Sequence, residues 1–195
     1  MKRIFVLLSF ACIALSGYSQ EHASQYYMSY FAKYYRIDVV NYENEGFCAK
    51  IDLESSNETV TPSLYIKYAN IPNFIVNLEI IKTRFVKHAL QAVKDGTKNV
   101  KTPLESYFKR GFITYATNSK IYQDTNIKMK AFFEVKDDGQ CLAVIKSPAF
   151  TAPKREAENN ARSFFIFQTP DEFDELIDHL KKLNETAVVS KFDSV

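Results

Sequence analysis

The sequence predicts an α+β fold, with mostly antiparallel sheet and two main helices packed on one side of it. The clearest observation is the strand, turn and helix pattern of residues 163–183, and a weaker copy of that pattern lies at residues 63–85. The third observation is the apolar and polar alternation over residues 47–53, which is typical of a strand with one buried face. Together they indicate a sheet that needs helices to cover one side.

The first 19 residues have the pattern of a bacterial-type secretory signal peptide. Lys2 and Arg3 precede an apolar run over residues 4–15, and small residues follow up to Ser19. The run is too short to span a bilayer. We therefore expect an exported protein, periplasmic or secreted, that is cut near Ser19 and has no transmembrane segment after cleavage.

Residues 20–195 are expected to form one domain, because the chain is 46% hydrophobic and 25% charged. Without Lys2 and Arg3, the 25 basic residues fall to 23 and equal the 23 acidic residues. Residues 63–130 hold 12 basic and 4 acidic residues. This segment either forms a basic face for an anionic partner or is neutralised by its acidic flanks on folding.

The first elements follow a tyrosine-rich segment. Residues 21–33 fit a short helix or an extended arm, and residues 34–42 are predicted to form a strand. Clustered tyrosines can contact a glycan or a protein, but we expect these to lie along a sheet edge. Further strands are expected at residues 47–53 and 64–69.

A helix is predicted from about Pro72 to Asp95, because Gly96 is a typical helix end. Asn70 is its expected N-cap. Apolar residues lie around much of its surface, so we expect it to be the more deeply buried helix.

Residues 103–109 are expected to form one or two helical turns, and strands are expected at residues 112–117 and 127–135. Residues 148–162 form a charged loop between prolines, which would serve as a lid or simply be mobile.

The dipeptide Asp138-Gly139 predicts a two-residue type I′ hairpin loop. In that register Val135 would pair with Leu142 on the core face of the sheet, and Lys136 would pair with Cys141 on the other face.

The last helix has the strongest local signals. Thr169 is the expected N-cap, Pro170 the first helical residue and Glu172 the reciprocal capping glutamate. A single apolar stripe follows at spacings of three and four: Phe173, Leu176, Ile177, Leu180 and Leu183. The repeated pattern also suggests two related halves, residues 34–96 and 111–187.

Few residues suggest chemistry. Cys48 and Cys141 remain after signal cleavage, and an exported protein could join them in a disulfide if their strands were neighbours. Glu175 and His179 share a helical face, but two ligands do not make a metal site, and an ion pair is favoured. No catalytic residue, metal ligand or cofactor is predicted, because the sequence has none of the common catalytic or phosphate-binding motifs.

The leading hypothesis is therefore an exported, non-catalytic binding or accessory protein, with a protein, a glycan or a small apolar molecule as partner. Nucleic acid is not expected as a partner of an exported protein. One alternative is a carrier of a small apolar ligand in a cavity between sheet and helices. The other is a hydrolase or an inhibitor-like protein with a site built from loops.

Overall fold

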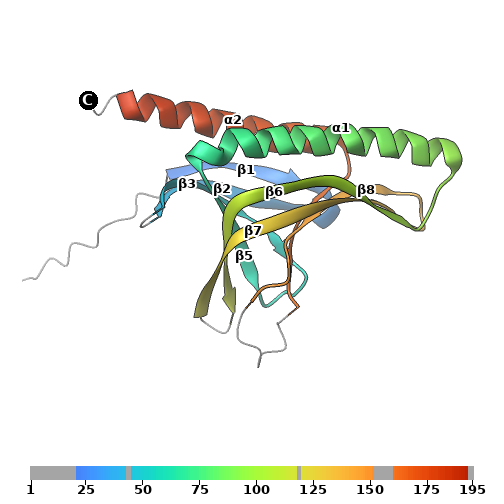
Figure 1. The fold of residues 1–195 in the computed structure, drawn as a ribbon, viewed down its shortest axis with the longest axis horizontal. Helices are drawn as coiled ribbons and strands as arrows, with labels where there is room; N and C mark the ends of the chain where they lie inside the picture. The colour runs from blue at the N-terminus through green and yellow to red at the C-terminus, as the bar shows by residue number, and fades with distance from the viewer. Residues whose placement is uncertain (1–20, 43–44, 118–119, 152–159, 193–195) are drawn as a thin grey trace, which may run out of the picture.

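The computed structural model describes residues 21–42, 45–117, 120–151 and 160–192, and the backbone alone at residues 21–23, 109–110 and 186–192. The described residues form one nine-stranded antiparallel sheet and two long helices, which lie on the same side of the sheet (Figure 1). The predicted α+β fold is confirmed.

The elements have the following bounds. The strands are β1 (Glu21–Met28), β2 (Lys33–Tyr42), β3 (Gly46–Asp52), β4 (Glu54–Ser55), β5 (Thr61–Lys67), β6 (Val100–Thr117), β7 (Lys120–Val135), β8 (Cys141–Lys146) and β9 (Ser163–Phe167). The helices are α1 (Ile71–Asp95) and α2 (Pro170–Phe192), with short 3-10 helices η1 (Ser29–Phe31) and η2 (Tyr68–Asn70).

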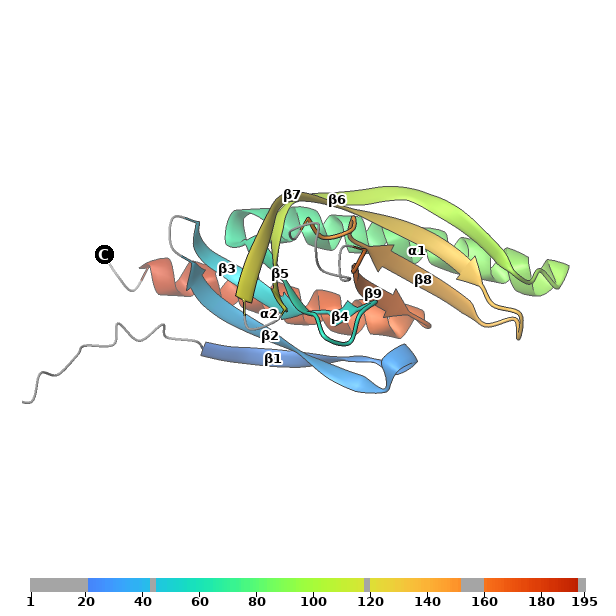
Figure 2. The same ribbon diagram turned by 90° about the horizontal axis from the view of Figure 1, so that it is seen from below.

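The sheet curls so strongly that its last strand returns to an early one. The strand order is β1-β2-β3-β5-β6-β7-β8-β9-β4, and Leu53 alone separates β3 from β4 in the chain. Ser56 N donates to Arg162 O at 2.9 Å, which continues the contact between β4 and β9. The side of the sheet away from the helices, called here the open side, is seen from below in Figure 2.

Helix α2 begins and packs as its sequence predicts. The carboxylate of Glu172 accepts a hydrogen bond from Thr169 N at 3.1 Å, which is one half of a capping box. All five residues of the predicted stripe are buried, and the ring centroids of Phe173 and Phe167 lie 3.9 Å apart. Burial of each large apolar side chain contributes about 1.5–3 kcal/mol.

Helix α1 lies antiparallel to α2. Lys82 contacts Asp174 at 2.6 Å, and Glu79 contacts Lys181 at 3.7 Å. Gly96 ends α1 in the left-handed conformation, as predicted, with φ of 60°.

The expected deep burial of α1 is only partly correct. One side packs on the sheet, but four apolar residues of α1 are exposed: Val76, Ile80, Leu90 and Val93. Apolar residues around a whole helix therefore do not show that the whole helix is buried, because the neighbouring elements cover only part of its surface.

The edge strand β1 is covered in part by α2. Tyr27 N donates to Glu175 at 3.2 Å, and Ser29 N donates to Glu172 at 3.0 Å. Glu175 thus occupies a backbone donor that the free edge of β1 would offer to another strand, and Glu172 occupies one in η1 directly after β1.

Two sequence predictions in the second half are wrong. Residues 103–109 form no helical turn, because they lie within the long strand β6. The pairing of β6 with β7 shifts between Pro103 and Tyr107, where Glu105 has a positive φ of 49°, so a bulge interrupts the strand.

The hairpin between β7 and β8 has a longer loop than predicted. Gly139 N donates to Lys136 O at 3.1 Å, and Gly139 has a φ of 88°. This geometry fits a turn followed by a glycine bulge. Val135 therefore pairs with Cys141 and not with Leu142. The shift by one residue turns every side chain of β8 to the other face of the sheet.

Candidate functional site

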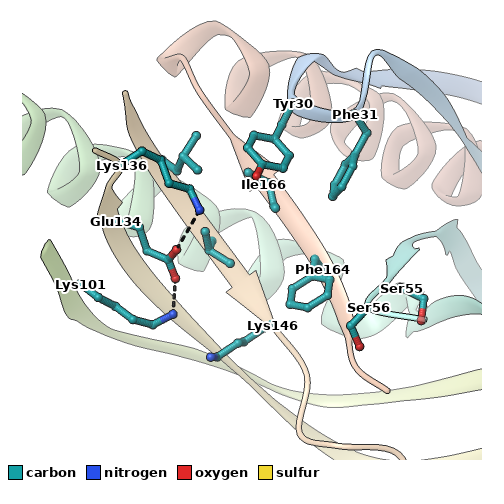
Figure 3. A pocket seen from close by; sticks show the side chains of 12 residues that line it. Tyr30, Phe31, Ser55, Ser56, Lys101, Glu134, Lys136, Lys146, Phe164 and Ile166 are labelled. Atoms are coloured by element: carbon teal, nitrogen blue, oxygen red, sulfur yellow. Dashed lines mark hydrogen bonds and ion pairs between the residues drawn. The ribbon is translucent and has the colours of Figure 1, made fainter. Parts of the chain in front are cut away.

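A hollow of about 360 Å³ lies on the open side of the sheet over β7, β8 and β9 (Figure 3). It is called here the lysine hollow. Its lining residues are Tyr30, Phe31, Ser55, Ser56, Lys101, Glu134, Lys136, Leu142, Val144, Lys146, Phe164 and Ile166.

The floor of the lysine hollow is apolar. Leu142 and Val144 of β8 and Ile166 of β9 are 0%, 5% and 8% exposed, although they face away from the helices. Phe31 of η1 and Phe164 of β9 pack against them as partly buried neighbours. The open side of the sheet thus carries a small apolar cluster that neither α1 nor α2 covers.

One wall of the hollow is basic. Lys101 of β6 and Lys136 both form ion pairs with Glu134, the second at 3.9 Å (Figure 3). Among the described lining residues, Glu134 is the one acidic residue, against three lysines.

Lys146 is the third lysine, at the end of β8. Among the described residues it has no carboxylate within ion-pair distance, and its Nζ atom lies 4.6 Å from the centroid of the Phe132 ring. Lys101 Nζ lies 5.0 Å from the same ring. Burial, together with the positive charges of Lys101 and Arg162, lowers the pKa of Lys146 below its ordinary value of 10.5.

A second hollow, of about 560 Å³, lies on the same side of the sheet over β2, β3 and β5. Its cations have acidic partners. Asp52 contacts Arg36 at 3.2 Å and Lys50 at 3.6 Å, and Lys50 also lies 3.9 Å from the buried Asp38. We call it the paired hollow.

The structure does not bring the two predicted disulfide residues together. Cys48 is in β3 and packs with Tyr65 and Phe112, whereas Cys141 is in β8 and packs against the core on the helix side. The strands β5, β6 and β7 lie between them in the sheet. Both thiols are free, and burial raises the pKa of Cys48 to about 11 and also raises the pKa of Cys141.

The Glu175 carboxylate accepts the hydrogen bond from Tyr27 N of β1. His179 lies one turn after Glu175 on α2. His88 stacks on Phe133, with ring centroids 5.3 Å apart. The described residues contain no group of three histidine, cysteine or acidic side chains that could hold a metal ion.

The predicted lid, residues 148–162, lies partly outside the described residues, which omit 152–159. Its described ends are anchored: Phe150 stacks on Tyr115 at 4.3 Å, and Thr151 N donates to the buried Asp124 at 2.9 Å. Phe150 N also donates to Ala161 O at 2.9 Å.

The lysine hollow could not be predicted from the sequence, because its floor depends on the hairpin register. Strand β8 has apolar residues on both faces, so alternation alone could not assign Leu142 and Val144 to a side. The signal that could have placed them is Gly139, which is the third residue of the loop and suits a left-handed bulge position.

Comparisons of the chain with protein families, with curated proteins and with solved structures found no match. Within the described residues, neither helix is long and apolar enough to cross a membrane.

Proposed function

We propose that the protein is an exported, non-catalytic binding protein that holds a small amphipathic ligand in the lysine hollow. The observation that carries this proposal is an apolar floor, built from β8 and β9, on the side of the sheet that the helices leave uncovered. The volume of about 360 Å³ falls at the small end of the range for small-molecule sites.

The site differs from a cavity between sheet and helices. That layer is filled by packed aromatic rings, among them Phe74 and Phe108 with centroids 4.5 Å apart. A ligand on the open side needs no displacement of this core, which favours the open side over that layer as the place of the ligand.

The groups of the hollow support binding more than catalysis. Two serines line the hollow, Ser55 of β4 and Ser56 directly after it. The Ser55 hydroxyl accepts a hydrogen bond from Asn57 N, and the Ser56 hydroxyl accepts one from Arg162 N. The described part of the lining contains no histidine that could activate either serine as a nucleophile.

Methyl NMR tests the proposal. We expect decanol and decanoate, below micelle concentrations, to shift the methyl resonances of Leu142, Val144 and Ile166 in a saturable way. Shifts confined to the exposed Leu90 and Val93 of α1, or no saturable shifts, would contradict it.

Substitution of Val144 sharpens this test. Val144→Asp should abolish binding, because a carboxylate at the buried floor removes its apolar character. The milder Val144→Thr should weaken binding several-fold with little change of shape. Val76→Asp is the matched control, because Val76 is exposed on α1, and it should bind as the wild type does.

The proposed export rests on residues 1–19, which lie outside the described residues. Mass spectrometry of exported protein should find an N-terminus near Gln20. An intact N-terminus in the exported material would contradict this part of the proposal.

A further inference from the structure

We infer that the ligand of the lysine hollow has an anionic head group, which binds between Lys101 and Lys146 above the Phe132 ring. This inference rests on the proposed function, because it names the chemistry of the ligand for the same site. The occupant is a single-chain amphiphile of small size, with a carboxylate or another acidic head.

The first step is the charge of the hollow. Three lysines line it with one carboxylate, Glu134, which Lys101 and Lys136 share. The described lining of the paired hollow also has three cations to one carboxylate, but there Lys33 contacts Glu54 at 3.2 Å and Lys50 lies 3.9 Å from Asp38. In the lysine hollow, Lys146 has no carboxylate within ion-pair distance among the described residues, so its positive charge stays in excess. An excess of one sign in a concave, partly apolar site favours a ligand of the opposite sign.

The positive charge is concentrated at Lys101 and Lys146. Lys101 and Lys146 hold their ammonium groups 5.0 and 4.6 Å from one ring, that of Phe132. The ring attracts each cation, but the two cations repel each other. An anion placed between them would relieve the repulsion and gain two charge-assisted hydrogen bonds.

The row of apolar side chains next to Phe132 gives the direction of the ligand's apolar tail. Phe132 pairs with Val144, and Val144 pairs with Ile166, so these three residues form one row across β7, β8 and β9. Strands in a sheet are spaced by about 4.8 Å, so the row spans about 10 Å. A ligand with its head at Phe132 would lay its tail along this row towards Phe31.

The register explains why the row and the lysine share a face. Lys146 follows Val144 by two residues in β8, and residues two apart in a strand point to the same side. Strand β8 therefore contributes to both parts of the site, Lys146 to the head and Val144 to the tail.

The experiment compares three decyl ligands by isothermal titration calorimetry at low salt: decanoate, decanol and decyltrimethylammonium. We expect decanoate to bind about tenfold more tightly than decanol, because hydrogen bonds to charged groups are stronger than neutral ones. The cationic ligand should bind most weakly. Equal affinity of decanoate and decanol would overturn the inference while the proposed function stands, and failure of all three would overturn the proposed function itself.

Variants assign the effect to the lysines. Lys146→Met should remove most of the preference for decanoate and retain decanol binding, which also shows that the variant is folded. Glu134→Gln should tighten decanoate binding several-fold, because it frees Lys101 and Lys136 from their carboxylate. Lys128→Met is the control, since Lys128 lies over Tyr107 at 4.1 Å and does not line the hollow. A preference that survives Lys146→Met, or a Glu134→Gln variant that binds decanoate less well, would contradict the inference.

Discussion

The lysine hollow and the paired hollow lie on the same side of one sheet, yet their charges are arranged differently. In the paired hollow, Asp52 accepts from Ser63 at 2.9 Å and contacts Arg36 and Lys50. In the lysine hollow, Lys146 has no such partner among the described residues. The fold neutralises the charges of the paired hollow, whereas the unmatched charge of Lys146 over an apolar floor is the basis of the ligand proposed above.

The largest effect is expected at Asp38 in the region of matched charges. Its carboxylate is 1% exposed and lies 3.9 Å from Lys50 Nζ. Asp38→Ala should lower the free energy of unfolding by about 2 kcal/mol, because it removes a buried carboxylate and leaves the Lys50 ammonium with Asp52, at 3.6 Å, as its described partner. Urea denaturation measures the change. An unchanged midpoint would show that the charge pairing on this part of the sheet is not structural.

Tyr35→Phe should lower the free energy of unfolding by less than Asp38→Ala does. The buried Tyr35 hydroxyl donates a hydrogen bond to the Glu54 carboxylate, and the variant lacks it. Its removal should cost about 1 kcal/mol near neutral pH. Burial raises the pKa of Glu54, but hydrogen bonds from Tyr35 and Lys33 outweigh burial and lower it below its ordinary value of 4.5.

The pH dependence of that loss has a definite sign. A carboxyl with a lowered folded pKa contributes stability above its unfolded pKa and loses it as the pH falls through the folded pKa. The gap between wild type and Tyr35→Phe should therefore narrow below about pH 4.5. Denaturation series at several pH values measure it, and a gap that widens in acid would contradict the assigned hydrogen bond.

The smallest change in the free energy of unfolding is expected for Lys146→Met, and it is a stabilisation. Lys146→Met should stabilise the ligand-free protein by about 0.5 kcal/mol, because it removes an unmatched charge next to Lys101. Because the pKa of Lys146 is lowered on folding, the unfolded chain binds the lysine proton more tightly than the folded protein does. The charged Lys146 therefore destabilises the fold at neutral pH, and this destabilisation fades as the pH rises towards 10.5. The stability advantage of the variant should shrink accordingly in alkaline buffer. A destabilised variant would show that Lys146 belongs with the matched charges.

Local signals predicted the helices and their layer, but they did not predict the site. The cap at Glu172 and the stripe from Phe173 to Leu183 depend on residues a few positions apart, so their sequence pattern is sufficient. The side chain of Asn70 makes no capping hydrogen bond to the start of α1, and the helix nevertheless begins at Ile71.

The site depends on pairings between distant residues. Lys101 reaches Glu134 through the pairing of β6 with β7, and Ile166 joins Val144 through the pairing of β8 with β9. One misassigned loop at Gly139 placed Leu142 in the core and so concealed the floor of the hollow. The two related halves and the export of the chain stay predictions.

The most direct test of the account is the set of intermolecular NOEs between decanoate and methyl-labelled protein. We expect contacts from the middle of the decanoate chain to the methyl groups of Val144 and Ile166. Contacts with α1 methyl groups alone, such as those of Leu90, would contradict the assignment of the lysine hollow as the binding site.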